Sequence, residues 1–428
     1  MGVRFYAREG GPHWLRAFRH RNYRLFFLGQ TIALNGNWMT MTAMGWLLFR
    51  LTEDPFLLGL MAFCLQAPAF LLASFGGLLV DRVSRRGVLL FAQGADALAV
   101  AVLAFLTFTN QAGVPHVLAT CLFLGVIKAL DMPARQTLVA DIVDLREDLP
   151  NAIALNSSIF HGARMTGPLL AGALVIPLAG EGACFLLHSI TLLGAMICVK
   201  RLRPKGRMAK TPGESLFGQL AEGFRYTFGF KPVRGLVLLT AAVAFFGMPY
   251  NTLLPVFARQ VLGGDSGTFG LLVAACGGGA VAAAAWLAMR PSVLGMGRVI
   301  GWNTVFFGTG LLLFACTPFL GGALVFLFVT GFSSIAAIVA ANTIVQTLVE
   351  DGLRGRVMSL LGMIFMGAMP LGSLLLGQGA RLFGAPTAVA FAGLATTAAG
   401  VWFLFRLPAL REEARPVYES RGLVRGKP

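Results

Sequence analysis

Long apolar runs alternate with short polar segments along almost the whole chain. Each run holds about 18 or more mostly apolar residues, which is enough for a helix to cross a hydrocarbon core of about 30 Å. The pattern therefore predicts an all-α polytopic membrane protein with twelve transmembrane helices. We expect these helices at about 23–50, 56–80, 88–109, 115–141, 152–177, 182–200, 233–257, 266–289, 298–317, 320–348, 357–380 and 386–406.

One long polar stretch, Lys200–Arg234, interrupts this alternation between the sixth and seventh runs. Apolar residues recur at helical spacing within 214–230, which predicts a short amphipathic helix lying on the membrane face. The stretch divides the chain into two halves of six helices. The predicted units are an N-terminal arm (1–22), a first bundle (23–200), a linker (201–232), a second bundle (233–406) and a basic tail (407–428).

The two halves share short sequences at equivalent places. Gln136-Thr-Leu-Val139 closes the fourth run, and Gln346-Thr-Leu-Val349 closes the tenth. Pro168 in the fifth run likewise corresponds to Pro370 in the eleventh. Such repeats predict two pseudo-symmetric bundles related by an axis along the membrane normal.

Charge and composition agree with a membrane protein and set its orientation. Of 428 residues, 56% are apolar and only 13% are charged, although the net charge is +16. Almost every Lys and Arg falls in the two termini or the even-numbered loops. The exceptions are three cations inside the runs and three residues on the opposite side of the membrane, Arg50, Arg259 and Arg381. This positive-inside pattern predicts a bacterial inner-membrane protein with both termini in the cytoplasm. We expect the excess charge to attract anionic lipid, and we expect no nucleic-acid binding.

The sequence offers little sign of other chemistry. All six cysteines lie within predicted helices, where they are expected to be small buried apolar residues, with neither disulfides nor a metal site. No cleavable signal peptide is apparent before the first run. No zinc-ligand pair, nucleophile elbow, phosphate-binding glycine loop or catalytic carboxylate pair is found, so we expect neither an enzyme nor a bound cofactor. The sequence also contains no charged ring or filter-like segment of the kind that would indicate a channel.

A charged turn joins the second and third runs: Gly77-Leu-Leu-Val-Asp81-Arg82-Val-Ser84-Arg85-Arg86. Gly77 would allow close helix approach, and the arginines would anchor the loop on the cytoplasmic side. Asp81 has no anchoring use, so we expect it to cap a helix or pair with a cation on another helix. The alternative is an ordinary polar turn between two spans.

This turn closely resembles the loop signature of the major facilitator superfamily, Gly-x-Leu-x-Asp-Arg-x-Gly-Arg-Arg, with Ser84 in place of the second glycine. The resemblance implies two six-helix bundles that expose a central cavity alternately to each side of the membrane. In that setting Arg135, near the cytoplasmic end of the fourth run, is within plausible reach of Asp81. Such a pair would hold one conformation and break in the other.

Five charged residues lie inside the apolar runs of the first half, and none lies at comparable depth in the second: Asp96, Lys128, Asp131, Arg135 and Arg164. Charge in a membrane usually faces a cavity or a partner. Lys128, Asp131 and Arg135 share one helix face and could simply neutralise one another. Arg164 needs an anionic partner, which could be Asp131, Asp96 or a substrate. Asp96 and Asp131 are the candidate proton carriers.

The fifth run contains small residues beside a proline: Gly162, Gly167, Pro168 and Gly172. Small residues permit close helix packing and Pro168 would bend the helix. Within the superfamily this segment resembles the Gly-Pro-x-x-Gly-Gly signature of exporters and antiporters, with Ala171 replacing one glycine. Generic helix packing is the alternative.

Several longer phrases resemble a subgroup of drug and siderophore exporters that includes the enterobactin and macrolide exporters. They are Phe18–Phe26, Asp131–Gln136, Leu149–Ser157, Ala163–Pro168 and Leu353–Ser359. The resemblance implies efflux of small amphipathic organic compounds with inward proton movement. We separately expect the protein to be a monomer. The subgroup also resembles a lysophospholipid flippase, so import and lipid flipping stay open as alternatives.

Overall fold

The structure is a computed structural model of the chain. It describes residues 13–143, 145–203, 216–290, 292–350 and 352–421. Within these ranges, the side chains at 13–15, 73–74, 77–78, 81–82, 140, 146 and 216–220 lie outside the description. The described part is helical, joined by turns and short loops, with no strand among its residues.

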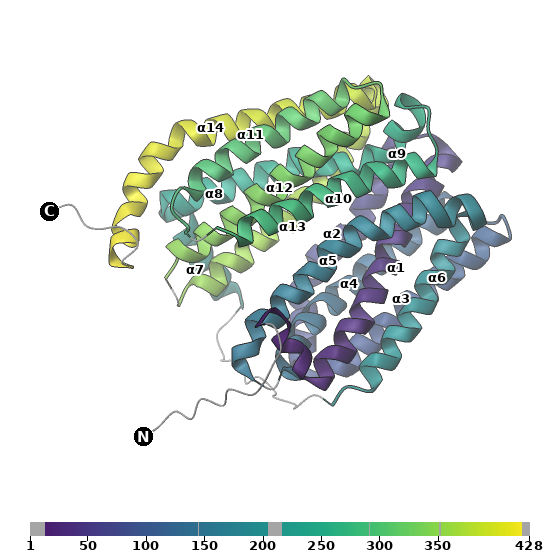
Figure 1. Cartoon of the computed structure of the whole chain (residues 1–428), viewed down its shortest axis with the longest axis horizontal. Coiled ribbons are helices and arrows are strands. Elements are labelled where there is room, and N and C mark those ends of the chain that lie inside the picture. Colours follow the sequence, from purple (N-terminus) through teal and green to yellow (C-terminus); the bar gives the residue numbers. More distant parts are fainter. Residues whose placement is uncertain (1–12, 144, 204–215, 291, 351, 422–428) are drawn as a thin grey trace.

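The first half of the chain forms one group of six long helices (Figure 1). In this group α1 packs against α5 and α6, α4 packs against α2 and α3, and α3 also packs against α6. A short 3-10 helix, His13–Arg19, precedes the group. The six helices are α1 (Arg21–Thr52), α2 (Pro55–Arg82), α3 (Arg85–Phe108), α4 (Val114–Ile142), α5 (Leu149–Leu170) and α6 (Ile176–Lys200).

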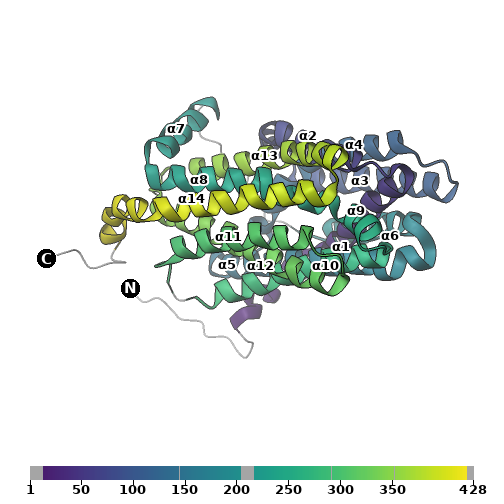
Figure 2. The same cartoon turned by 90° about the horizontal axis from the view of Figure 1, so that it is seen from above.

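The second half forms another group, reached through the short helix α7 (Leu216–Gly229), which packs against α13. Here α12 packs between α10 and α11, and α14 packs along α11. The remaining helices are α8 (Lys231–Ala242), α9 (Leu254–Val256), α10 (Ser266–Ala288), α11 (Met296–Ala315), α12 (Leu320–Leu348), α13 (Arg354–Phe383) and α14 (Ala385–Ser420). Figure 2 shows the same helices from above, where the two groups partly overlap in the view.

Ten segments of the described chain are long and apolar enough to cross a membrane. One of them, Leu149–Lys200, has 52 residues and includes both α5 and α6. Its backbone leaves the helical conformation at Gly180, where φ is 76° and ψ is 176°. Only glycine adopts that conformation readily, so Gly180 separates two helices. The segment around α1 is absent from the ten, in keeping with its polar residues Gln30, Asn35 and Asn37.

Two of the predicted helices are less regular than expected. After Pro168, α5 passes into a π-helical turn, Ala171–Val175, before α6. The run expected as one helix at 233–257 is divided into α8, a π-turn, a 3-10 turn, α9 and a second π-turn. Pro249 and Pro255 lie in this divided part. Each proline removes a backbone donor and displaces the preceding turn, so a straight α-helix cannot continue there.

The two groups meet at the end of the molecule opposite the termini. A Cβ atom on Gly59 of α2 would lie 2.3 Å from the Ser373 carbonyl oxygen of α13, and one on Gly172 would lie 2.2 Å from the Ser266 carbonyl oxygen. Arg381 and Asp54 approach to 3.7 Å at the same end. We call this the closed end.

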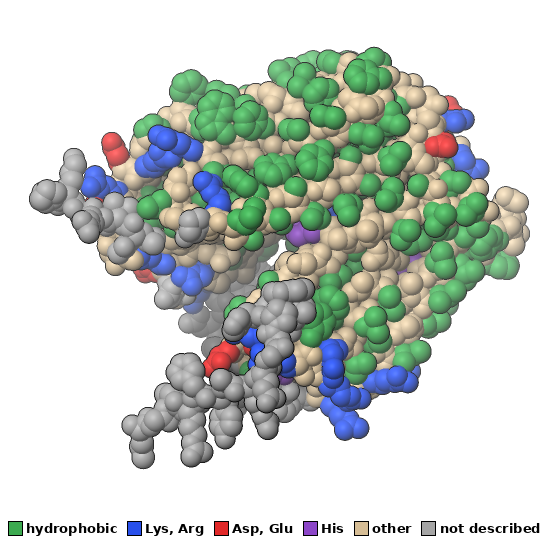
Figure 3. Space-filling view, in the orientation of Figure 1, with side chains coloured by type: hydrophobic (Ala, Val, Ile, Leu, Met, Phe, Trp, Pro, Cys, Tyr) green, Lys and Arg blue, Asp and Glu red, His purple; other side chains and the backbone are tan. Residues whose placement is uncertain are grey.

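The start of α1 and the end of α14 lie at the other end, where the two groups of helices diverge (Figure 1). On this side the space-filling view shows the surface hollowed between the two groups (Figure 3). We call this the terminus-bearing end, and the space between the groups the central hollow.

Candidate functional site

Arg164 lies where the two groups of helices come together. It extends from α5, with its guanidinium carbon 5.9 Å from the centroid of the Trp38 ring on α1. Its Nη2 lies 4.0 Å from Sγ of Cys276 on α10, in the second half of the chain. Among the described residues no carboxylate lies within ion-pair distance of Arg164. A half-buried cation between two halves, with an aromatic face beside it, has the charge to attract an anion.

The second half contributes polar atoms to the same place. The Tyr250 hydroxyl and the Cys276 Sγ are 2.7 Å apart, and both residues are buried. Tyr250 belongs to the 3-10 turn Met248–Leu253, so the irregular backbone of this run positions it. The sequence gave no sign of the contact between Tyr250 and Cys276.

Asp131 and Arg135 form an ion pair along α4. Nη2 of Arg135 is 2.6 Å from Oδ2 of Asp131, and each side chain is about one-fifth exposed (20% and 19%). Arg135 also donates to Oε1 of Gln30, a buried residue of α1. The predicted shared face of α4 is therefore present, and Gln30 is a partner that the sequence did not indicate.

Asp96 and Lys128 lie near this pair, deeper in the first group. Asp96 interacts electrostatically with Lys128, Asp131 and Arg135, although none of them is within ion-pair distance of it. Its Oδ1 is buried without a hydrogen-bond partner. Nε2 of His188 on α6 is in the same condition, while Nδ1 lies 2.9 Å from the Thr40 hydroxyl. These groups form a polar interior that a transferred proton could enter.

The five charged residues thus fall into two sites. Asp96, Lys128, Asp131 and Arg135 lie together among α1, α3 and α4. Arg164 lies apart from them, and the expected pairing with Asp131 or Asp96 is not formed in this conformation. Asp131 is already occupied by Arg135, one helical turn away.

The charged turn between α2 and α3 is partly described. Nη1 of Arg85 lies 2.8 and 2.7 Å from the two carboxylate oxygens of Asp141, in the last turn of α4. Arg86 donates to the backbone carbonyl of Lys200. Ser84 accepts a hydrogen bond from the Gly87 amide and caps α3, which gives the departure from the family pattern a structural use.

The remaining members of this turn, Gly77, Asp81 and Arg82, have side chains outside the described residues, so the Asp81–Arg135 contact stays a prediction. Arg135 itself has partners on α1 and α4 in this conformation. The neighbouring Gly76 does allow close approach, because a Cβ there would lie 2.1 Å from the Ala129 carbonyl oxygen.

The glycines of the fifth run differ from one another. A Cβ on Gly167 would lie 2.6 Å from Cβ of Trp38, so this glycine lets α5 approach α1. Gly172 does the same against α10, and the carbonyl of Pro168 faces Gly270. Gly162 does not: a Cβ there would meet no atom within 4 Å. Close packing therefore explains Gly167 and Gly172 but not Gly162.

The sequence missed one ion pair altogether. Nε of Arg50 lies 2.8 Å from Oε1 of Glu181, which joins the end of α1 to the start of α6 at the closed end. Arg50 was assigned only to the far side of the membrane. Pairing between residues so distant in the chain leaves no local pattern that could have revealed it.

Comparisons with known proteins agree with this arrangement. The staphyloferrin A transporter of Staphylococcus aureus is 26% identical over 386 residues, which cover 89% of this chain and 95% of that protein. The multidrug efflux pump Tap of Mycolicibacterium fortuitum is 23% identical over 389 residues, covering 88% and 93%. Each alignment covers more than nine-tenths of the relative, so neither relative has a large domain outside it.

Solved structures share the fold. The bacterial homologue of the human lysosomal transporter Spinster, in its inward-facing unoccupied conformation, aligns with a TM-score of 0.68 at 16% identity, covering 93% of this chain and 98% of that one. The nucleoside transporter NupG gives 0.68 at 15% identity, covering 90% and 99%. With these relatives and this fold, the chain is a membrane transporter and not an enzyme. A sequence profile described as transmembrane secretion effector matches residues 14–421, and the chain therefore belongs to that family of the major facilitator superfamily.

Proposed function

We propose that this protein is a secondary active transporter that exports small amphipathic organic compounds, anionic ones in particular, in exchange for protons. The observation that carries the proposal is Arg164, which lies between the two halves with an aromatic partner and no described carboxylate. Keeping an unpaired cation at that depth in the membrane costs free energy unless an anionic ligand neutralises it. The apolar surroundings would hold the rest of an amphipathic molecule.

The proposal requires twelve crossings in two six-helix halves. Ten segments qualify by composition, one of which is two helices separated at Gly180, and the long helix α1 supplies a further candidate. Two groups of helices that meet at the closed end and diverge at the other would rock about the central hollow. This motion gives alternating access.

The orientation follows from charge. Lys and Arg are concentrated in the termini and in the loops at the terminus-bearing end, which would be cytoplasmic by the positive-inside rule. The described conformation would then be open to the cytoplasm and closed to the outside. An exporter loads its substrate in that state.

Coupling would use the first group of helices. Asp131 pairs with Arg135, and a proton taken up by this carboxylate would release Arg135 toward another partner. Asp96, with its unpartnered buried oxygen, would assist or serve as the alternative carrier. This supports an antiport cycle in which protonation of these carboxylates alternates with binding of an anionic substrate at Arg164.

Export is favoured over the alternatives by the relatives. One is described as a multidrug efflux pump and the other as a transporter of staphyloferrin A. An importer or a lysophospholipid flippase of the same fold would use the same central hollow, and each is an outcome of the test below.

The test is a substrate-stimulated proton flux assay on purified protein in vesicles. Drugs, siderophores and lysophospholipids are added in turn while an internal dye reports pH. We expect amphipathic anions to drive proton movement opposite to their own. Proton flux in the same direction as the substrate would indicate an importer, and lysophospholipid transfer without proton movement would indicate a flippase.

A further inference from the structure

A large cavity lies away from the central hollow, at the terminus-bearing end of the second group of helices. Its volume is about 520 Å³, within the range of small-molecule sites. Most of its lining is apolar and comes from α8, α12, α14 and the loop before α11. The apolar lining includes Leu236, Leu294, Leu348, Phe403, Leu407 and Leu410.

The cavity exists because α14 continues beyond the span expected from the sequence. The predicted helix ends at 406, whereas α14 runs to Ser420 with Pro408 and Pro416 inside it. Leu407 and Ala414 are buried against the second group, which holds this extension in place. The tail is therefore part of the wall of a cavity.

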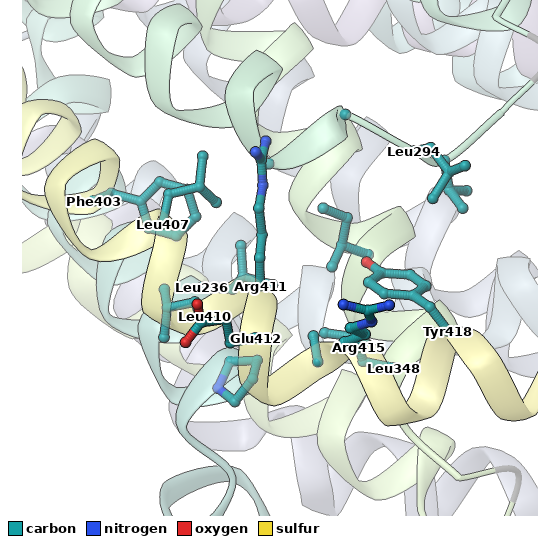
Figure 4. Close-up of a pocket in the computed structure, with 16 residues that line it drawn as sticks. Leu236, Leu294, Leu348, Phe403, Leu407, Leu410, Arg411, Glu412, Arg415 and Tyr418 are labelled. Carbon is teal, nitrogen blue, oxygen red and sulfur yellow. The ribbon is translucent and has the colours of Figure 1, made fainter. Parts of the chain in front are cut away.

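The charged groups around the cavity are unevenly paired. Glu413 is 2.7 Å from Lys231, and Glu419 is 2.7 Å from Arg415. Figure 4 shows Arg411 extending from α14 on one side of the cavity, with Glu412 turned the other way and Arg415 beside Tyr418. Two of the nearby acids are thus already neutralised.

Arg411 and Arg298 have no such partner. Arg298, in the first turn of α11, is close enough to Arg411 to repel it electrostatically. Among the described residues neither arginine has a carboxylate within ion-pair distance. The N-terminus of α11 begins at Met296, beside the cavity, and the positive end of its helix dipole adds to the positive potential. Arg411, Arg415 and Glu412 line the cavity, but Arg415 is paired with Glu419 and Glu412 turns away from Arg411. The charges of Arg411 and the nearby Arg298 therefore face no described carboxylate.

We propose that this cavity binds an anionic phospholipid of the cytoplasmic leaflet, with its phosphate on Arg298 and Arg411 and part of an acyl chain against the leucines. The assignment to that leaflet rests on the proposed orientation. The binding itself does not depend on the transport cycle or the direction of transport. Because α14 forms one wall of the cavity, a bound lipid would hold the C-terminal part of α14 in place relative to the surrounding membrane.

The experiment measures lipid retention by native mass spectrometry of the purified full-length protein. Delipidated protein is titrated with phosphatidylglycerol or with phosphatidylcholine of the same acyl chains. We expect the wild type to prefer phosphatidylglycerol and the double variant Arg298→Gln/Arg411→Gln to bind it about 10- to 30-fold more weakly, as two lost arginine contacts predict.

A matched control removes two charges at the same end but outside the cavity, Arg201→Gln/Arg406→Gln, and should keep the preference. Leu294→Trp, which fills the cavity from its loop, should weaken both lipids without changing the charge. Equal loss in both double variants would overturn the proposal in favour of diffuse surface attraction. Displacement of the lipid by equimolar glycerol 3-phosphate would overturn it in favour of a site for a soluble anion.

Discussion

The two groups of helices differ in where they hold charge. The first group holds five charged side chains within its apolar helices, and two of these form an ion pair. The second group holds none at comparable depth; its charges lie near the helix ends, in the linker and in the tail. Near the Arg164 guanidinium, the second group instead contributes Cys276 and Tyr250, whose side chains are polar but uncharged.

This difference affects how the two halves could move relative to each other. If both halves held buried charges facing each other, rocking would break ion pairs in an apolar medium at a cost of several kcal/mol. With the charges on one side only, the other half can slide past them without leaving a charge unpaired. On the proposed mechanism, the first half would bind and couple, while the second half would close over it.

The largest expected effect is at Asp131. Asp131→Asn should abolish transport driven by a pH gradient, a loss of tenfold or more, while exchange at equal pH persists. The reason is that the amide cannot carry a proton yet still accepts a hydrogen bond from Arg135. The control is Asp141→Asn, which alters an ion pair outside the central hollow. Full pH-driven transport by Asp131→Asn would place coupling elsewhere, with Asp96 the next residue to test.

The second largest effect is expected for a glycine at the contact between the two halves. Gly172→Ala would put a methyl group against the Ser266 carbonyl and destabilise the closed end by about 1–3 kcal/mol. Distances between spin labels at Glu53 and Leu382 should then shift toward the separated state. Gly162→Ala, which meets no neighbouring atom, is the matched control on the same run. An equal shift in both variants would show that the contact does not control closure.

Sequence patterns predicted the helices well, because a membrane-spanning helix must be long and apolar. They also identified the five charged residues inside the apolar runs of the first group, since charge stands out in an apolar run. They could not predict which polar side chains contact one another: Arg135 with Gln30 and Arg50 with Glu181 join residues more than 100 positions apart. The division of the helix around Pro249 and the cavity beside α14 likewise depend on packing between distant segments.

A smaller effect is expected where Arg85 meets Asp141. Both side chains are mostly buried, at 15% and 10% exposed, and the arginine contacts both carboxylate oxygens. A double-mutant cycle with Arg85→Gln and Asp141→Asn should give a coupling energy of about 1 kcal/mol in thermal unfolding. Additive effects of the two substitutions would mean that the pair adds nothing to the stability of the first group.

The smallest effect concerns the departure from the family loop. Ser84→Ala should cost about 1 kcal/mol of stability through loss of the cap on α3, whereas Ser84→Gly should cost only a few tenths. Thermal unfolding compares the two variants, with Ser157→Ala as a control for an exposed hydroxyl within a helix. If alanine and glycine behave alike, capping is not the use of Ser84.

The most direct test of the account is equilibrium binding of an amphipathic carboxylate and its methyl ester to purified protein. The two ligands differ only in charge, so their affinity ratio isolates the contribution of the site cation. The account predicts that the wild type prefers the acid by about 10- to 100-fold, which corresponds to one charge-assisted contact, and that Arg164→Gln binds both alike. An unchanged preference in Arg164→Gln would contradict the assignment of Arg164 as the anion site.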